Sequence, residues 1–177
     1  MSRAGWARNR PERRRDRQSE REKRGKRGGF IDPNGYDAGK KIKGKKRHIL
    51  VDTLGLLICA VIHPADIQDR DGGVLVLEAL FDRFPLLRKL FADGGYQGPK
   101  FRNAAKRVRR RLKVEIVKRS APGFKVLPKR WVVERTFAWF GRCRRLAKDF
   151  ECSSRSALAF LRWASVRLML RRLSNAE

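Results

Sequence analysis

The chain has 177 residues, 41% of them hydrophobic, which suits one domain with a core of ordinary size. Its 45 Lys and Arg against 18 Asp and Glu give a formal charge of +27, more than solubility requires. Such a charge predicts a polyanionic partner, with nucleic acid first and an anionic membrane surface as the alternative. No apolar run approaches the roughly 18 residues of a spanning helix, and no signal peptide opens the sequence. We therefore expect a cytoplasmic protein that spans no membrane.

The first 29 residues form a basic segment. They hold twelve Lys or Arg and four Asp or Glu, a local charge of 12 − 4 = +8, and no apolar side chain lies between Ala7 and Phe30. Residues that bury nothing cannot offset the entropy of ordering the chain. The sequence predicts a disordered tail over residues 1–29 and a folded domain over residues 30–177.

A basic cluster opens the predicted domain. Turn-forming residues 32–35 precede it, so we expect an exposed basic loop that leads into a strand. Two apolar runs, 49–52 and 56–62, then flank Gly55 and predict a β-hairpin. The cluster gives the first candidates for contact with DNA phosphates: Lys40, Lys41, Lys43, Lys45, Lys46 and Arg47.

The remaining elements alternate between helix and strand. Apolar residues at helical spacing predict a helix from Asp69 toward Pro85, and residues 90–92 predict a buried strand. A basic helix and a strand over residues 114–117 follow. Two further helices are expected at about 130–149 and 156–173. The order indicates a mixed α/β fold without internal repeats.

Two carboxylates stand in unusual surroundings. Asp93 ends the apolar run 90–92 before Gly94 and Gly95, which predicts a place at the carboxyl edge of a sheet, where α/β proteins hold ligands. Glu134 lies near the start of an aromatic helix, one turn after Arg130. From spacing alone, a turn Asp and a helical ion pair are the commoner outcomes.

Other polar residues favour structural roles. Asp66, Asp69 and Asp71 suit helix capping and a solvated turn better than a metal loop. His48 and His63 have no Cys or Ser partner at a recognisable spacing, so we interpret both as structural. The cysteines are odd in number and lack C-x-x-C spacing, which predicts reduced thiols without a bound metal. The aromatic residues of the long helix are expected in the core, although they are also able to stack on bases: Trp131, Phe137, Trp139 and Phe140.

Four stretches together resemble a known family: "GYDAGKKIKGKKRHILVDTLGL", "HPADIQDRDG", "LFADGGYQG" and "KRWVVERTFAWFGRCRRL". In this order they are similar to the carboxyl-terminal catalytic half of bacterial insertion-sequence DDE transposases of the insertion-sequence-five and insertion-sequence-four type. The resemblance implies a ribonuclease H-like mixed sheet flanked by helices and the cutting and joining of DNA at transposon ends. It also implies an Asp, Asp, Glu triad holding two Mg²⁺ or Mn²⁺, in which Asp93 is the second acid and Glu134 the third. DNA ends, target DNA and further copies of the full-length protein are the implied partners, at the nucleoid.

The implied chemistry explains these residue types. Two divalent ions activate the attacking oxygen and stabilise the leaving oxygen, and hard ions prefer carboxylate ligands. Arg130, Arg135 and Arg142 are candidates to hold DNA phosphates nearby. The chain departs from the family pattern at Leu127 and Gly141, where the relatives carry a Tyr and a basic residue. Arg142 comes one position late for that basic residue.

The first acid of the triad is missing where the family has it. There the family carries a motif of the kind A-A-V-I-D-S-Q-S-V-K on the central strand, whereas this chain has "RRRDRQSEREK", in which Asp16 echoes the motif but predicts no strand. Codons exist for residues 13–26 whose neighbouring frame reads A-A-V-I-D-S-Q-S-V-K-S-A-E-K. We therefore interpret residues 1–29 as an out-of-frame translation and expect the central first strand to be missing. The chain is then an inactive or partial copy. The alternatives are a non-catalytic basic DNA-binding protein and an inhibitor of the full-length transposase.

Overall fold

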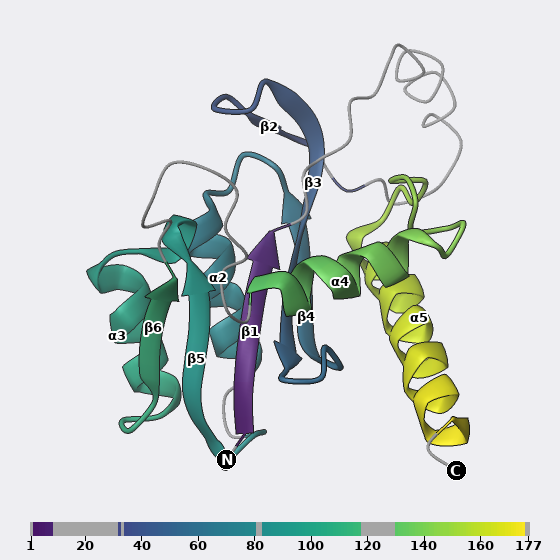
Figure 1. Ribbon diagram of the computed structural model, residues 1–177. Helices are drawn as coiled ribbons and strands as arrows, with labels where there is room; N and C mark the ends of the chain where they lie inside the picture. The colour runs from purple at the N-terminus through teal and green to yellow at the C-terminus, as the bar shows by residue number, and fades with distance from the viewer. Residues whose placement is uncertain (1, 9–31, 33, 81–82, 118–129, 176–177) are drawn as a thin grey trace, which may run out of the picture.

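The structure, a computed structural model, describes residues 2–8, 32, 34–80, 83–117 and 130–175. Its strands and helices alternate much as the sequence predicts (Figure 1). In chain order they are β1 (Ser2–Arg8), β2 (Gly35–Asp37), β3 (Ile42–Asp52), β4 (Leu57–Pro64), α2 (Asp69–Ala79), β5 (Leu87–Asp93), the short 3-10 helix η1 (Gly94–Tyr96), α3 (Pro99–Val108), β6 (Lys113–Val117), α4 (Arg130–Gly141) and α5 (Ser154–Ser174).

The strands form one mixed sheet with the order β2-β3-β1-β5-β6, and β4 also pairs with β3. Strand β1 runs antiparallel to β3, with Trp6 opposite Leu50, and parallel to β5, with Gly5 opposite Phe91. Strand β6 runs parallel to β5. The antiparallel pair β3–β4 confirms the predicted hairpin. This mixed α/β arrangement is compatible with a ribonuclease H-like fold.

The expectation that a central strand is missing was wrong in one respect. Residues Ser2–Arg8, from the predicted tail, form β1 and fill the position between β3 and β5. Central strands pair on both sides, so this short segment supplies a ladder that the sheet would otherwise lack. The rest of the predicted tail, from residue 9 to residue 29, lies outside the described residues.

Helices cover both faces of the sheet. Figure 1 shows α4 crossing in front of β1 and α2 lying behind the sheet. One apolar cluster joins α2 and α3 to Leu50 and Leu90, and a second joins α4 and α5 to Ile49 and Val51. Successive strand residues point to opposite faces, so one strand supplies both cores. The continuous apolar run in β3 suits a strand that is covered on both sides.

The expected exposed basic loop is instead the first half of β3. The strand begins at Ile42, and both Lys45 and Lys46 are buried. Lys45 donates to the carbonyls of Glu151 and Cys152, at 3.1 and 2.8 Å, in the loop before α5. Partners from distant segments thus satisfy buried charges that sequence reasoning assigned to solvent.

Two predicted helices end earlier than expected. Helix α2 ends at Ala79 rather than near Pro85, and α4 ends at Gly141 rather than at Asp149. After α4 the chain turns tightly, since the amide of Cys143 donates to the carbonyl of Phe140 at 2.9 Å. Helix α5 agrees well with its prediction, and Ser153 caps it by accepting from the amide of Arg155. No helix in the described ranges is long and apolar enough to cross a membrane.

Candidate functional site

Asp93 is the last residue of β5, as the apolar run before it predicts. Leu90 and Ala92 belong to the core on the α2 and α3 side of the sheet. Alternation along the strand therefore places Phe91 and Asp93 on the opposite face, the one that α4 and α5 cover. The Asp93 carboxylate is thus at the carboxyl end of a strand next to the central strand, partly exposed.

The turn after β5 holds this carboxylate in place. Asp93 Oδ1 accepts from the amide of Gly95 at 2.9 Å, which caps η1. A Cβ built on Gly95 would lie 3.1 Å from Asp93 Oδ1 and 3.7 Å from Asp69 Oδ2. The two carboxylates therefore flank the same glycine. The spacing of Asp93 and the glycines predicted this turn, whereas only the fold brings Asp69 beside it.

Glu134 lies in the second turn of α4, exposed to solvent. The helix packs into the core through Val133, and Thr136 donates to the carbonyl of Gly55 at 2.9 Å. Arg135 donates to the carbonyl of Leu54 in the same β3–β4 turn. Steps of about 100° per residue put Glu134 and Arg135 on opposite flanks of the buried stripe.

The sheet register shows at which end of the sheet the turn contacted by Arg135 lies. Asp52, at the end of β3, pairs with Ala4 near the start of β1, and β1 starts beside the start of β5. The β3–β4 turn that Arg135 contacts is therefore at the end of the sheet opposite Asp93. Figure 1 shows α4 running across the strands, in front of β1. That the carboxylates of Glu134 and Asp93 meet at the end where β5 stops, and share a metal cluster there, stays a prediction.

None of the described residues supplies an acid at the strand position that carries the first acid of the triad in the resembled family. The β1 sequence SRAGWAR contains no acid, although β1 occupies the strand position that carries the first acid in the resembled family. No group of three or more His, Cys, Asp or Glu side chains in the described residues is arranged to hold a metal ion. Asp16 lies outside the described residues.

The basic candidates divide into internal and exposed residues. The Lys46 ammonium is buried and bonds to the carbonyl of Ile67 at 2.8 Å and to the Asp37 carboxylate at 3.0 Å. Half-buried Arg47 donates to the carbonyl of Leu146 at 2.9 Å. Alternation along β3 explains the pattern, since odd-numbered residues face α4 and α5 and even-numbered residues face α2. The candidates with exposed side chains are Lys41, Lys43 and Arg142.

Lys40 and the α4 arginines complete the candidate set. Lys40 pairs with Asp37 at 3.6 Å. Of Arg130 the structure describes only the backbone, as the first residue of α4. The Arg135 guanidinium stacks between Trp131 and Trp139, 4.3 and 4.6 Å from the ring centroids. With its bond to Leu54, this sandwich gives Arg135 an intramolecular role that the sequence did not suggest.

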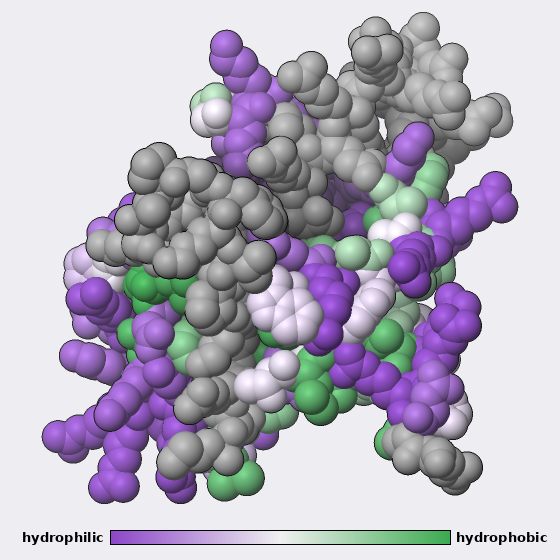
Figure 2. Space-filling view, viewed as in Figure 1, coloured by the Kyte–Doolittle hydropathy of each residue, from purple (hydrophilic) through white to green (hydrophobic). Residues whose placement is uncertain are grey.

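A further basic surface was not among the predicted candidates. Helix α3 and the turn before β6 expose a dense set of cations, and Figure 2 shows hydrophilic residues gathered on the side of the molecule where α3 and β6 lie. The basic run of residues 106–113 could have indicated this surface from the sequence. The exposed residues of this surface are Lys100, Arg102, Lys106, Arg107, Arg110, Arg111 and Lys113.

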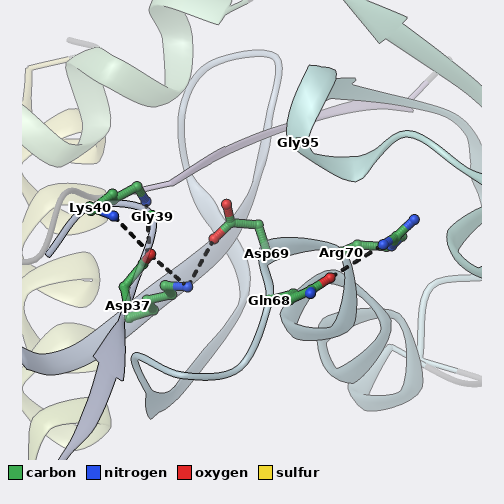
Figure 3. A pocket seen from close by; sticks show the side chains of 8 residues that line it. Asp37, Gly39, Lys40, Gln68, Asp69, Arg70 and Gly95 are labelled. Atoms are coloured by element: carbon green, nitrogen blue, oxygen red, sulfur yellow. Dashed lines mark hydrogen bonds and ion pairs between the residues drawn. The ribbon is translucent and has the colours of Figure 1, made fainter. Parts of the chain in front are cut away.

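A polar cavity of about 440 Å³ opens beside the Asp93 turn (Figure 3). The buried Lys46 ammonium lines it, 3.0 Å from Asp37 and 3.5 Å from Asp69. Burial acts to raise the pKa of Asp37, but hydrogen bonds and charge attraction from Lys46 and Lys40 outweigh it and hold that pKa below its ordinary value. The lining residues are Asp37, Gly39, Lys40, Lys46, Gln68, Asp69, Arg70 and Gly95. No local pattern in the sequence indicates that residues 37–46, residues 68–70 and Gly95 meet.

Comparison with known families gives a match over most of the chain. The family described as the transposase DDE domain matches residues 8–169. The chain belongs to the DDE transposase family. The matched range runs from the last residue of β1 into α5, and so includes both Asp93 and Glu134.

A relative within bacterial insertion sequences supports the same membership. The chain is 34% identical over 142 residues to a putative transposase for the insertion sequence element IS402 of Burkholderia cepacia. The alignment covers 73% of this chain and 64% of the relative, so the chain spans somewhat less than two thirds of that transposase. The resemblance stated from the four motifs, to bacterial insertion-sequence DDE transposases, is confirmed.

Proposed function

We propose that this chain is a copy of the DDE catalytic domain, the part of a transposase that cuts and joins phosphodiester bonds in DNA transposition. The observation that supports this most directly is the position of Asp93. It ends the strand beside the central strand, on the face that α4 covers, and α4 carries the exposed Glu134. Membership of the DDE transposase family supports the interpretation of these two carboxylates as members of a catalytic triad.

Asp93 and Glu134 are the proposed carboxylate ligands of divalent cations, Mg²⁺ or Mn²⁺. Carboxylate oxygens suit such hard ions better than they suit soft ones. A pair of such ions activates the attacking oxygen and stabilises the leaving oxygen of a phosphodiester. Asp93 and Glu134 would hold and orient such ions when these bind. The bond between Gly95 and Asp93 fixes one carboxylate at the strand end.

The proposed site lacks one ligand, because β1 contributes no acid. With two carboxylates, a two-metal site does not hold both ions in line, so we propose that the chain is an inactive or partial copy of a transposase. The interpretation of residues 1–29 as an out-of-frame translation explains how the first acid was lost.

DNA is the proposed partner, at transposon ends and target sites near the nucleoid, with homo-oligomers formed by a full-length protein. The formal charge of +27 and the exposed cations of α3 and β6 support a large, salt-sensitive attraction to phosphates. Exposed Arg142, just beyond α4, is the α4-region candidate for a phosphate contact. Lys45, Lys46 and Arg135 have internal partners and are not part of this proposal.

Metal binding and cleavage test the proposal separately. Mn²⁺ binding, followed by electron paramagnetic resonance, is expected to weaken on Asp93→Asn and on Glu134→Gln but not on Asp71→Asn, whose carboxylate pairs with Lys100 on the protein surface. Cleavage of DNA that carries the element's ends is expected to be absent from the chain as it stands. End-specific cleavage that is lost on Asp93→Asn would show that a first acid is present after all.

The absence of an acid from β1 also favours a second candidate function. A chain that binds transposon ends without cutting them would compete with the active enzyme or poison its assembly. Such an inhibitor is expected to bind DNA with an affinity that falls steeply as salt rises, and to leave the DNA intact with either cation. Adding the chain to an active relative and measuring end cleavage distinguishes an inhibitor from an inert copy.

A further inference from the structure

A buried polar cluster lies directly behind the Asp93 turn. Tyr96, three residues after Asp93, is completely buried, and its hydroxyl shares a hydrogen bond of 2.7 Å with Nδ1 of His48 in the middle of β3. The His48 ring stacks on His63 of β4, with centroids 4.7 Å apart. Nδ1 of His63 donates to the carbonyl of Pro64. The β3–β4 hairpin and the segment after β5 thus meet where His48 bonds to Tyr96 and stacks on His63.

Helix α2 closes this cluster at its two adjacent glycines. A Cβ at Gly72 would come within 2.5 Å of His48 Nε2 and closer still to His63 Nε2. A Cβ at Gly73 would lie 2.6 Å from the Tyr96 ring. Both glycines are buried, so the helix backbone itself packs against the rings. Only glycine allows that approach, and the aromatic groups are held between the helix and the sheet.

Such a cluster is costly to keep in a core. Burying imidazole and hydroxyl groups requires desolvation, and the hydrogen bonds that offset it need accurate geometry. Apolar residues of similar volume would fill the same space without that requirement. The polar cluster instead fixes an orientation, because the hydrogen bond to His48 sets the position of the Tyr96 hydroxyl and therefore of its ring. The backbone of η1 must then follow, and η1 is the turn whose Gly95 amide bonds to Asp93.

We propose that His48 is a positioning residue that acts through the Tyr96 hydroxyl to hold the η1 turn, and with it the Asp93 carboxylate, in the orientation for binding a divalent cation. This inference rests on the proposed function for its cation, but its structural half stands alone. His48 is not itself one of the proposed cation ligands. The cluster also explains why the turn leads straight into a fully buried tyrosine instead of an exposed polar residue.

Variants at Tyr96 and His48 and a control variant elsewhere separate an effect on the orientation of the η1 turn from a loss of overall stability. Tyr96→Phe removes only the hydroxyl, and His48→Leu removes its partner, whereas His48→Asn places an amide near the position of Nδ1 and retains a hydrogen bond. Thr136→Val is the matched control, because it also deletes a buried hydroxyl, at the opposite end of the sheet. All four are compared after correction for their overall stability, measured by urea unfolding of the full chain.

The first measurement is hydrogen exchange of the amides of residues 93–97. Tyr96→Phe and His48→Leu are expected to speed this exchange about five- to tenfold beyond the change in global unfolding, as loss of one buried hydrogen bond implies. His48→Asn is expected to restore most of the protection, and Thr136→Val to leave the turn unchanged. Equal protection in wild type and Tyr96→Phe would overturn the inference.

The second measurement is the dissociation constant for Mn²⁺. Tyr96→Phe and His48→Leu are expected to weaken binding about three- to tenfold, whereas His48→Asn and Thr136→Val are expected to bind Mn²⁺ nearly as well as the wild type. If the wild type binds no Mn²⁺ although the turn loosens in Tyr96→Phe, the proposed function fails while the structural half of the inference holds. If Mn²⁺ binds wild type and Tyr96→Phe equally well, the positioning role is refuted and the proposed function stands.

Discussion

Replacement of Gly72 by alanine sets two opposing effects against each other. Alanine is favoured over glycine inside a helix by about 1 kcal/mol, so propensity alone predicts a more stable protein. At this position, however, the new methyl would lie 2.5 Å from His48 Nε2 and nearer still to His63 Nε2, and both rings are buried. Overpacking of this kind costs about 1–3 kcal/mol, or more where the neighbours have no room to move. With both rings buried, the cost should lie at the upper end of that range, about 2–3 kcal/mol, so packing should prevail with a net destabilisation of about 1–2 kcal/mol.

The same substitution at Gly141 supplies the control. Gly141 is the last residue of α4, and a Cβ there would meet nothing within 4 Å, so only the propensity term applies. For a chain of this size, 1 kcal/mol corresponds to about 2–4 °C in Tm. Thermal unfolding should show a Tm about 2–8 °C lower for Gly72→Ala and an unchanged or slightly higher Tm for Gly141→Ala. If both variants gained stability alike, the close approach of α2 to the histidines would be refuted.

Further predictions concern charge, pH and the missing acid. Lys46→Met should destabilise by about 3 kcal/mol, because it leaves Asp37 and Asp69 without their shared buried cation, whereas exposed Lys41→Met should change the free energy of unfolding by less than about 0.5 kcal/mol; urea unfolding compares them. Burial lowers the pKa of His63, so as the pH falls, His63 is protonated in the unfolded chain at a higher pH than in the folded chain. Stability should be complete above about pH 6.5 and should fall as the pH drops below it, while His63→Asn should flatten that slope; a pH series of denaturation midpoints that is equally steep in both proteins would contradict this. Replacement of residues 13–26 by A-A-V-I-D-S-Q-S-V-K-S-A-E-K, joined to the amino-terminal part of a full transposase, should restore end-specific cleavage with Mg²⁺ or Mn²⁺ that Asp93→Ala and Glu134→Ala abolish; a repaired protein that leaves such DNA intact would refute the frame interpretation.

Local signals in the sequence determined most elements of the fold. Apolar runs broken by Gly55 predicted the β3–β4 hairpin, and residues 90–92 before Asp93 predicted the end of β5. These features follow from short-range rules, in which alternation and turn residues fix the local backbone. The four motifs, compared with a family, gave the membership that the match over residues 8–169 confirms.

Long-range pairing decided what the local rules could not. Ser2–Arg8 belongs to a basic, turn-prone segment, yet it forms the central strand because β3 and β5 leave a ladder open on both sides. Lys45 and Lys46 were predicted to face solvent because a lysine-rich run normally does. Their burial depends on the carbonyls of Glu151 and Ile67, which are distant in sequence.

The candidate site shows the same division. Asp93 and Glu134 were identified from their motifs, since each sits in a local pattern that a single segment can display. The sandwich around Arg135, the approach of Asp69 to Gly95 and the bond between His48 and Tyr96 each join elements that the sequence separates. No local pattern encodes such contacts, because their energies depend on which surfaces the packed sheet and helices bring together.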